Sequence, residues 1–159
     1  MSVYIPKNRG SYLGWLSRVD KTLPMPTLVY MSDLEVGGYY FHPNCSGLVL
    51  DDIEIENPNG TIVVNYSPTC DHDYYPERSV LAHEWRHHWQ FFNRDFKNEK
   101  RPKFDFSRYD TYEAEMVRFF SSLPSEMDAL RFEYKTVKGE HSRWVMSLLQ
   151  KHKGMSLCQ

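Results

Sequence analysis

The segment Leu81–Gln90 reads LAHEWRHHWQ and contains the pattern H-E-x-x-H, formed by His83, Glu84 and His87. On a helix, residues four apart lie one turn above each other on the same face, so the two imidazoles can bind one metal ion. Two neutral imidazoles suit zinc, and a nearby carboxylate that is not a ligand can take a proton from zinc-bound water. The pattern therefore predicts a zinc site with His83 and His87 as metal ligands and Glu84 as the catalytic base.

A helix around this motif is indicated by the residues on either side. Pro76 and Glu77 suit a first helical turn. Four apolar residues follow at helical spacing and would form one stripe, namely Leu81, Trp85, Trp89 and Phe92. The alternative is a surface helix of a histidine-rich chain, with its imidazoles solvated or packed on tryptophans. We favour the metal site because the motif fits its helical setting so well.

The motif supplies two ligands, whereas a catalytic zinc commonly keeps three and leaves one position for water. The longer pattern with a third histidine fails, because Gln90 stands where glycine is expected and Asn93 where histidine is expected. His88 projects about 100° around the helix from His87, and it follows Glu84 by four residues. We therefore expect His88 to orient or neighbour the base.

The third ligand is expected among carboxylates further along the chain, which are Glu113, Glu115, Glu126, Asp128 and Glu133. Glu113 fits a capping box with Asp110, and Glu115 fits a solvated helix surface. Glu126 is favoured because it opens a helix after Pro124, close to the small Ala129, where helices can pack tightly near the metal. Glu113 and Glu133 remain the main alternatives.

Three segments, HEWRHHWQ, YEAEMVRFF and PSEMDALRFEYK, resemble the small zincin-like metallopeptidases of phage and prophage genomes. The resemblance covers about Tyr75 to Lys135 and is not recognisable before Asp51. In such zincins the glutamate of a downstream E-x-D/E-A segment is the third zinc ligand, which maps onto Glu126. Zincins also place the motif helix behind a sheet whose edge strand lines the cleft, which implies that Thr61–Tyr66 is the edge strand.

The elements that must position these residues change character along the chain. Three runs in the first half have the composition of strands: Thr27–Met31, Val36–His42 and Thr61–Tyr66. A fourth, Asp52–Glu56, alternates apolar and acidic residues, and the turn signal Asn57–Gly60 predicts that it forms a hairpin with the last of them.

The second half has helical spacing. After the motif helix and a polar connection, we expect a helix capped at Asp110, another from Leu123 and Pro124 to Lys138, and a last one over His141–Lys153. The last helix should carry its apolar residues inward, namely Trp144, Val145, Leu148 and Leu149. A small, mostly antiparallel sheet packed on three to four helices is the α+β class.

Composition narrows the class of protein. A chain of 159 residues fits one domain, over residues 1–159, and 41% hydrophobic residues place it among globular proteins. A net charge of −2 does not favour a nucleic-acid partner. Lys97–Lys103 carries four basic residues and one acidic, which we interpret as a solvated loop. No signal peptide or membrane span is evident, so we expect a cytoplasmic protein, in a host cytoplasm or associated with a virion.

The cysteines do not form a recognisable site. Cys45, Cys70 and Cys158 are an odd number at wide spacing, which predicts reduced thiols. Cys70 lies beside His72 in a CDHD segment, which we interpret as a loop approaching the motif helix rather than a metal site.

The leading hypothesis is zinc-dependent peptide-bond hydrolysis on a peptide or protein substrate, with Glu84 activating a zinc-bound water. Four residues are candidate donors to the oxyanion: Tyr109, Tyr112, His88 and His141. A second hypothesis is a zinc-stabilised binding module, whose fourth ligand would be Cys70 or His72. A third is a protease acting on nucleic-acid-bound proteins through the basic loop. The sequence encodes neither the substrate, nor the native metal, nor the oligomeric state.

Overall fold

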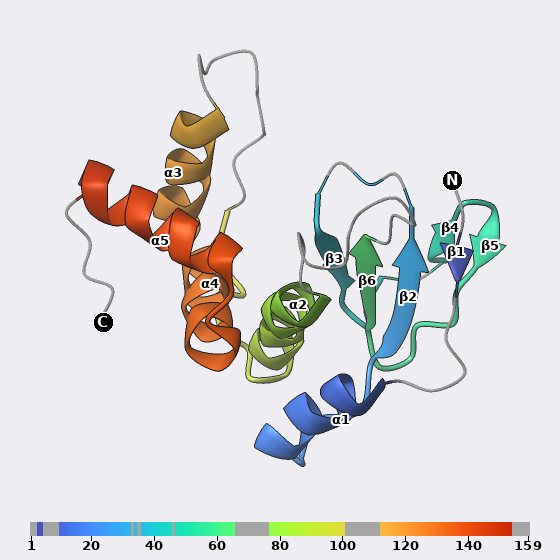
Figure 1. Ribbon diagram of the computed structural model, residues 1–159. Helices are drawn as coiled ribbons and strands as arrows, with labels where there is room; N and C mark the ends of the chain where they lie inside the picture. The colour runs from blue at the N-terminus through green and yellow to red at the C-terminus, as the bar shows by residue number, and fades with distance from the viewer. Residues whose placement is uncertain are drawn as a thin grey trace.

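The computed structural model describes residues 3–4, 10–32, 34, 36–45, 47–65, 77–100 and 112–153. Strands and helices follow one another as β1 (Val3–Tyr4), α1 (Gly10–Val19), β2 (Thr27–Met31), β3 (Gly38–Phe41), β4 (Val49–Leu50), β5 (Ile53–Glu54), β6 (Thr61–Asn65), α2 (Glu77–Phe92), α3 (Tyr112–Ser122), α4 (Pro124–Val137) and α5 (Glu140–Lys153). A sheet half followed by a helical half confirms the α+β class (Figure 1). Helix α2 lies between the sheet and the helices α3, α4 and α5.

The main sheet is mixed, with strand order β1-β2-β6-β3. Strand β2 pairs in parallel with β6, whereas β1 with β2 and β3 with β6 are antiparallel. The expectation of a mostly antiparallel sheet was therefore wrong for its central pair. The assignment of Thr61–Tyr66 as the edge strand was also wrong, because β6 lies between β2 and β3. Strand β3 is the edge nearest to α2 (Figure 1).

The predicted hairpin between Asp52–Glu56 and Thr61–Tyr66 does not form. Strand β5 pairs instead with β4. The tight turn between them is Asp51 and Asp52, with φ values of 49° and 62°. Two consecutive residues with positive φ are the signature of the two-residue turn that matches the twist of antiparallel strands. Residues 55–60 then lead to β6.

Helix α1 is not predicted by the sequence, because Gly10 and Gly14 lower its helix propensity. The helix nevertheless buries Leu13 and Leu16 completely. These leucines join a core with one face of the sheet and α2, made of Leu28, Ile62, Val64, Leu81 and Trp85. Burial against the sheet therefore outweighs the local cost of glycine.

The helical half has its own core, built from residues of α3, α4 and α5, including Val117, Leu130, Val145, Leu148 and Leu149. The inward residues expected of the last helix are confirmed except for Trp144, whose exposed fraction is 38%. The predicted cap Asp110 lies outside the described residues. Among the described residues, no helix is long and apolar enough to cross a membrane.

Candidate metal centre

Helix α2 presents two different faces to its two neighbours. Leu81 and Trp85 pack on the sheet. His83 and His87 lie on the side that faces α4, with ring centroids 5.0 Å apart. This division follows from helical periodicity, since residues two positions apart point to opposite sides of the helix.

Helix α4 brings Glu126 to the histidines. The helix begins at Pro124, whose missing N–H costs nothing in a first turn. Its N-cap residue Leu123 makes no side-chain cap, but Glu99 accepts a hydrogen bond from the backbone N–H of Ser125 at 2.8 Å. A carboxylate at this end also complements the helix dipole.

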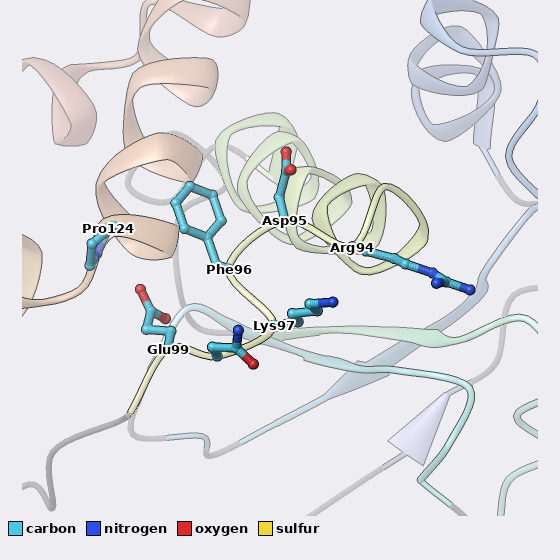
Figure 2. Close-up of a pocket in the computed structure, with 7 residues that line it drawn as sticks. Arg94, Asp95, Phe96, Lys97, Glu99 and Pro124 are labelled. Atoms are coloured by element: carbon cyan, nitrogen blue, oxygen red, sulfur yellow. The ribbon is translucent and has the colours of Figure 1, made fainter.

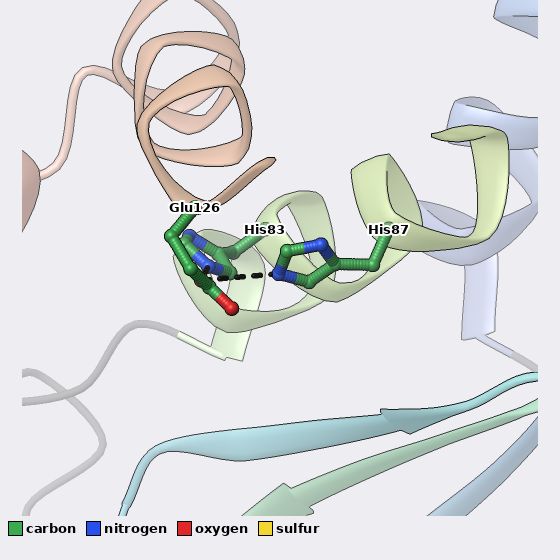
Figure 3. A group of neighbouring side chains, drawn as sticks. All are labelled: His83, His87 and Glu126. Atoms are coloured by element: carbon green, nitrogen blue, oxygen red, sulfur yellow. Dashed lines mark hydrogen bonds and ion pairs between the residues drawn. The ribbon is translucent and has the colours of Figure 1, made fainter. Parts of the chain in front are cut away.

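The three side chains converge on one point. Oε2 of Glu126 lies 2.9 Å from Nε2 of His83 and 3.2 Å from Nε2 of His87. Figure 3 shows the carboxylate reaching from α4 to both rings. One nitrogen of each histidine and one carboxylate oxygen lie within 4.8 Å of one another, so the group could hold a metal ion.

Of the carboxylates weighed from the sequence, Glu126 is the one at this point. Glu113 is exposed on α3. Glu115 is buried, with an ion pair of 3.6 Å to Arg118, so the expectation of a solvated residue was wrong. Glu133 is buried two turns after Glu126 on α4 and contacts the far nitrogen of His83.

In each histidine, the ring nitrogen that does not face Glu126, Nδ1, has its own hydrogen-bond partner. Nδ1 of His83 donates to Oε2 of Glu133 at 3.0 Å, and Nδ1 of His87 donates to Oε1 of Gln90 at 2.9 Å. A carboxylate and an amide oxygen can only accept, so both partners keep a proton on Nδ1. A neutral ring then has its lone pair on Nε2, which is the nitrogen that faces Glu126 in both histidines.

Hydrogen bonding within this group shifts the pKa values of His83 and Glu126 in opposite directions. Burial disfavours a charge on His83, but the hydrogen bonds to Glu126 and Glu133 outweigh it and raise the pKa of His83 well above its usual value. Burial also opposes the charge on Glu126, but the hydrogen bonds to His83 and His87 hold its pKa far below the usual range. Without metal, a proton takes the place between these groups that a metal ion would take.

Glu84 lies beside this group and is buried, with an exposed fraction of 7%. Burial raises the pKa of Glu84, an effect that the nearby His83 and His87 partly offset. The edge strand β3 passes close to it, because a Cβ on Gly38 would lie 3.3 Å from Cγ of Glu84 and only 2.6 Å from both the Val63 oxygen and Cγ1 of Val80. Only glycine at position 38 therefore allows α2 and β3 to approach this closely.

His88 does not orient Glu84, contrary to expectation, because both of its ring nitrogens have other partners. Nε2 donates to the carbonyl of Pro24 at 2.7 Å, so Nδ1 accepts the hydroxyl of Tyr40 at 2.9 Å. The ring is fully buried, and burial lowers the pKa of His88. This histidine therefore joins α2 to the strand and loop beneath it.

The other candidate oxyanion donors are only partly placed. Tyr109 and the side chain of Tyr112 lie outside the described part of the structure. His141 lies in the first turn of α5, is partly buried, and has its pKa lowered by burial. It also interacts electrostatically with Glu133 and His83, so His141 remains a candidate donor beside the metal group.

The sequence singled out two further features, the segment with Cys70 and His72 and the basic loop after the motif helix. Cys70 and His72 fall outside the described residues. Figure 2 shows a shallow hollow on the loop after α2, which Lys97 lines together with Asp95 and Glu99. Residues 101–103 lie outside the described residues, so the interpretation of Lys97–Lys103 as a solvated loop stays a prediction.

Sequence reasoning missed the polar residues that surround the ligands. Gln90 donates to Asp128 at 2.8 Å, and Arg86 donates to both oxygens of Asp128 at 2.8 and 3.2 Å. Helical spacing placed Gln90 within reach of His87, but its partners on α4 are visible only after folding.

No protein-family model, curated protein or solved structure matches this chain.

Proposed function

We propose that this protein is a zinc-dependent peptidase of the zincin type, which hydrolyses peptide bonds. The observation that carries the proposal is the convergence of His83, His87 and Glu126, with the buried carboxylate of Glu84 next to His83 in sequence. Two imidazole nitrogens and one carboxylate oxygen form a donor set that catalytic zinc sites use.

The residues present fit a zinc ion in two further respects. Glu133 and Gln90 hold the Nδ1 protons, so the Nε2 lone pairs of His83 and His87 are available as ligands. The raised pKa of His83 and the lowered pKa of Glu126 support the proposal, because both shifts mean that the carboxylate of Glu126 favours a positive charge on its histidine partners.

When bound, zinc would polarise the scissile carbonyl and make a water acidic near neutral pH. Glu84 is the group of this chain suited to take the proton of that water as it attacks the carbonyl carbon. It would then deliver the proton to the nitrogen of the leaving amine, which completes the cleavage of the C–N bond. A raised pKa suits this role, because the same carboxyl must accept and then release a proton.

A substrate peptide would bind along β3. Among the described strands, β3 lies at the edge of the sheet and has β6 as its one neighbour. Extended peptides bind such edges by adding a strand. Because Gly38 of β3 adjoins Glu84, a peptide paired there would pass the base.

The competing function is a zinc-stabilised binding module. A structural zinc site closes its fourth position with a protein ligand. The buried Glu84 favours a catalytic site, because a purely structural site has no use for a base. No observation in the described structure favours the basic loop as a nucleic-acid tether.

The test is a mass-spectrometric cleavage profile over a peptide library, with zinc content measured on the same samples. We expect Glu84→Gln to keep zinc and lose about 10²-fold or more in turnover, and His83→Ala to lose both. Glu113→Gln removes the same charge at an exposed position and should behave as the parent. Equal turnover in Glu84→Gln and the parent would remove the base assignment. Zinc binding without cleavage of any peptide would favour the binding module.

A further inference from the structure

Gln90 lies beside the metal centre and makes hydrogen bonds to residues of both α2 and α4. It lies three residues after His87 on α2 and is buried, with an exposed fraction of 4%. Its amide oxygen accepts the Nδ1 hydrogen of His87 at 2.9 Å. Its amide nitrogen donates to the carbonyl of Ser125 at 2.9 Å and to Asp128 at 2.8 Å.

These contacts connect two of the three prospective ligands. One end of the amide fixes the ring of His87, while the other end holds the first turn of α4 on either side of Glu126. A shift of α2 along α4 would break both hydrogen bonds that the Gln90 nitrogen donates to α4, while the bond between Gln90 and His87 lies within α2. The distance between the His87 nitrogen and the Glu126 oxygen is therefore coupled to one amide group.

The orientation of this amide is itself fixed. Asp128 accepts hydrogen bonds from Arg86 at 2.8 and 3.2 Å and from Gln90 at 2.8 Å, so it faces Gln90 as an acceptor. The guanidinium of Arg86 lies 3.9 Å from the centre of the Trp89 ring and is thus held in place. With two acceptors on one side, the nitrogen of the Gln90 amide must face α4 and its oxygen must face His87.

We propose that Gln90 is a positioning residue of the metal centre, which sets the metal affinity of the site without contacting the ion. It does so by keeping His87 in the Nδ1-protonated form and by holding Glu126 opposite to it. This inference rests on the metal site of the proposed function and not on peptide hydrolysis.

The experiment measures zinc affinity by competition with a chromogenic chelator, and the visible spectrum of the cobalt-substituted protein. Gln90→Met keeps the length of the side chain but removes all three hydrogen bonds. Gln90→Glu still accepts from His87, but loses both donations and places a second carboxylate beside Asp128. Gln150→Met, at an exposed position of α5, is the matched control.

We expect Gln90→Met to weaken zinc binding by about 10- to 100-fold and to change the cobalt spectrum. Gln90→Glu should bind zinc more weakly than the parent but more tightly than Gln90→Met, because its carboxylate accepts the same hydrogen from His87 while both hydrogen bonds to α4 are lost; its metal-free form should melt at a lower temperature than the parent. Gln150→Met should match the parent in both measurements. If Gln90→Met does not fold, Gln90→Glu carries the test, because it separates affinity from stability.

Unchanged affinity in Gln90→Met would overturn the inference. So would a loss of affinity in both variants that follows their loss of melting temperature, since a merely structural role predicts that result. A parent protein that binds no zinc would overturn this inference together with the proposed function. A parent that binds zinc as tightly as Gln90→Met does would overturn this inference alone.

Discussion

Replacing Glu126 by glutamine tests the electrostatics of the metal-free site. The buried carboxylate accepts hydrogen bonds of 2.9 and 3.2 Å from two histidines. Removing one partner of a buried ion pair costs about 3–5 kcal/mol. The amide oxygen of glutamine still accepts one hydrogen bond, worth about 1 kcal/mol. We therefore expect Glu126→Gln to lower the free energy of unfolding of the metal-free protein by about 2–4 kcal/mol.

This loss depends on pH in a direction that the two pKa shifts fix. The pKa of Glu126 is lowered in the folded state, so its contribution is present above its unfolded value of 4.5 and is lost as the pH falls through the folded pKa. The pKa of His83 is raised, so its contribution is full below 6.5 and is lost as the pH rises through the folded pKa. The loss of unfolding free energy in Glu126→Gln should therefore be largest between the unfolded pKa of Glu126, 4.5, and the unfolded pKa of His83, 6.5.

The assay is urea unfolding of chelator-treated protein, followed by tryptophan fluorescence at about pH 5.5 and about pH 9. Glu113→Gln, an exposed carboxylate on α3, is the control and should change the free energy of unfolding by less than about 0.5 kcal/mol. A loss below about 1 kcal/mol in Glu126→Gln, or an equal loss at the two pH values, would refute the reasoning.

Three further outcomes follow from the same structure. Gly38→Ala should lower the free energy of unfolding by about 1–3 kcal/mol, because its Cβ would lie 2.6 Å from both the Val63 oxygen and Cγ1 of Val80; a thermal melt that matches the parent would contradict the close approach of β3 to α2. Tyr40→Phe should cost about 1–3 kcal/mol in urea unfolding, because Nδ1 of the buried His88 loses its donor; a neutral effect would mean that this hydrogen bond contributes nothing. Zinc at about a thousand times its dissociation constant should stabilise the protein by about 4 kcal/mol, and a chelator should reverse this in calorimetry. An unchanged melting temperature on adding zinc would argue against a folded-state metal site.

Local patterns in the sequence predicted the helical part of the site well. His83 and His87 share one face of α2 because helical spacing puts them there, whatever the rest of the fold does. The start of α4 was also predicted from a local signal, Pro124, which placed Glu126 in the first turn of that helix. What spacing could not provide was the choice among carboxylates, since only the packing of α4 on α2 separates Glu126 from Glu133.

The sheet was predicted less well, for two identifiable reasons. The segment Asn57–Gly60 has the composition of a turn and was interpreted as the centre of a hairpin, whereas the tight turn lies at Asp51 and Asp52. The four residues Thr61–Val64 are apolar or β-branched without alternation, and each is at most 2% exposed. Such an unbroken run is typical of a strand buried on both faces, so it indicated a central position for β6 rather than an edge.

The outer partners of the histidines were the least visible from sequence. Gln90 contacts the carbonyl of Ser125, 35 positions away along the chain, and Glu133 contacts His83 across 50 positions. Residue type alone gave Gln90 no role beyond ruling out a longer histidine motif. Its importance follows from burial and from three hydrogen bonds that depend on the packing of two helices.

A crystal structure of the zinc-loaded protein, with anomalous data collected at the zinc edge, tests the central claim most directly. The site described above predicts one strong peak at about 2.0–2.2 Å from Nε2 of His83, Nε2 of His87 and a carboxylate oxygen of Glu126. It also predicts a fourth position that no protein atom fills. An absent peak, or a zinc ion held by other residues, would contradict the account.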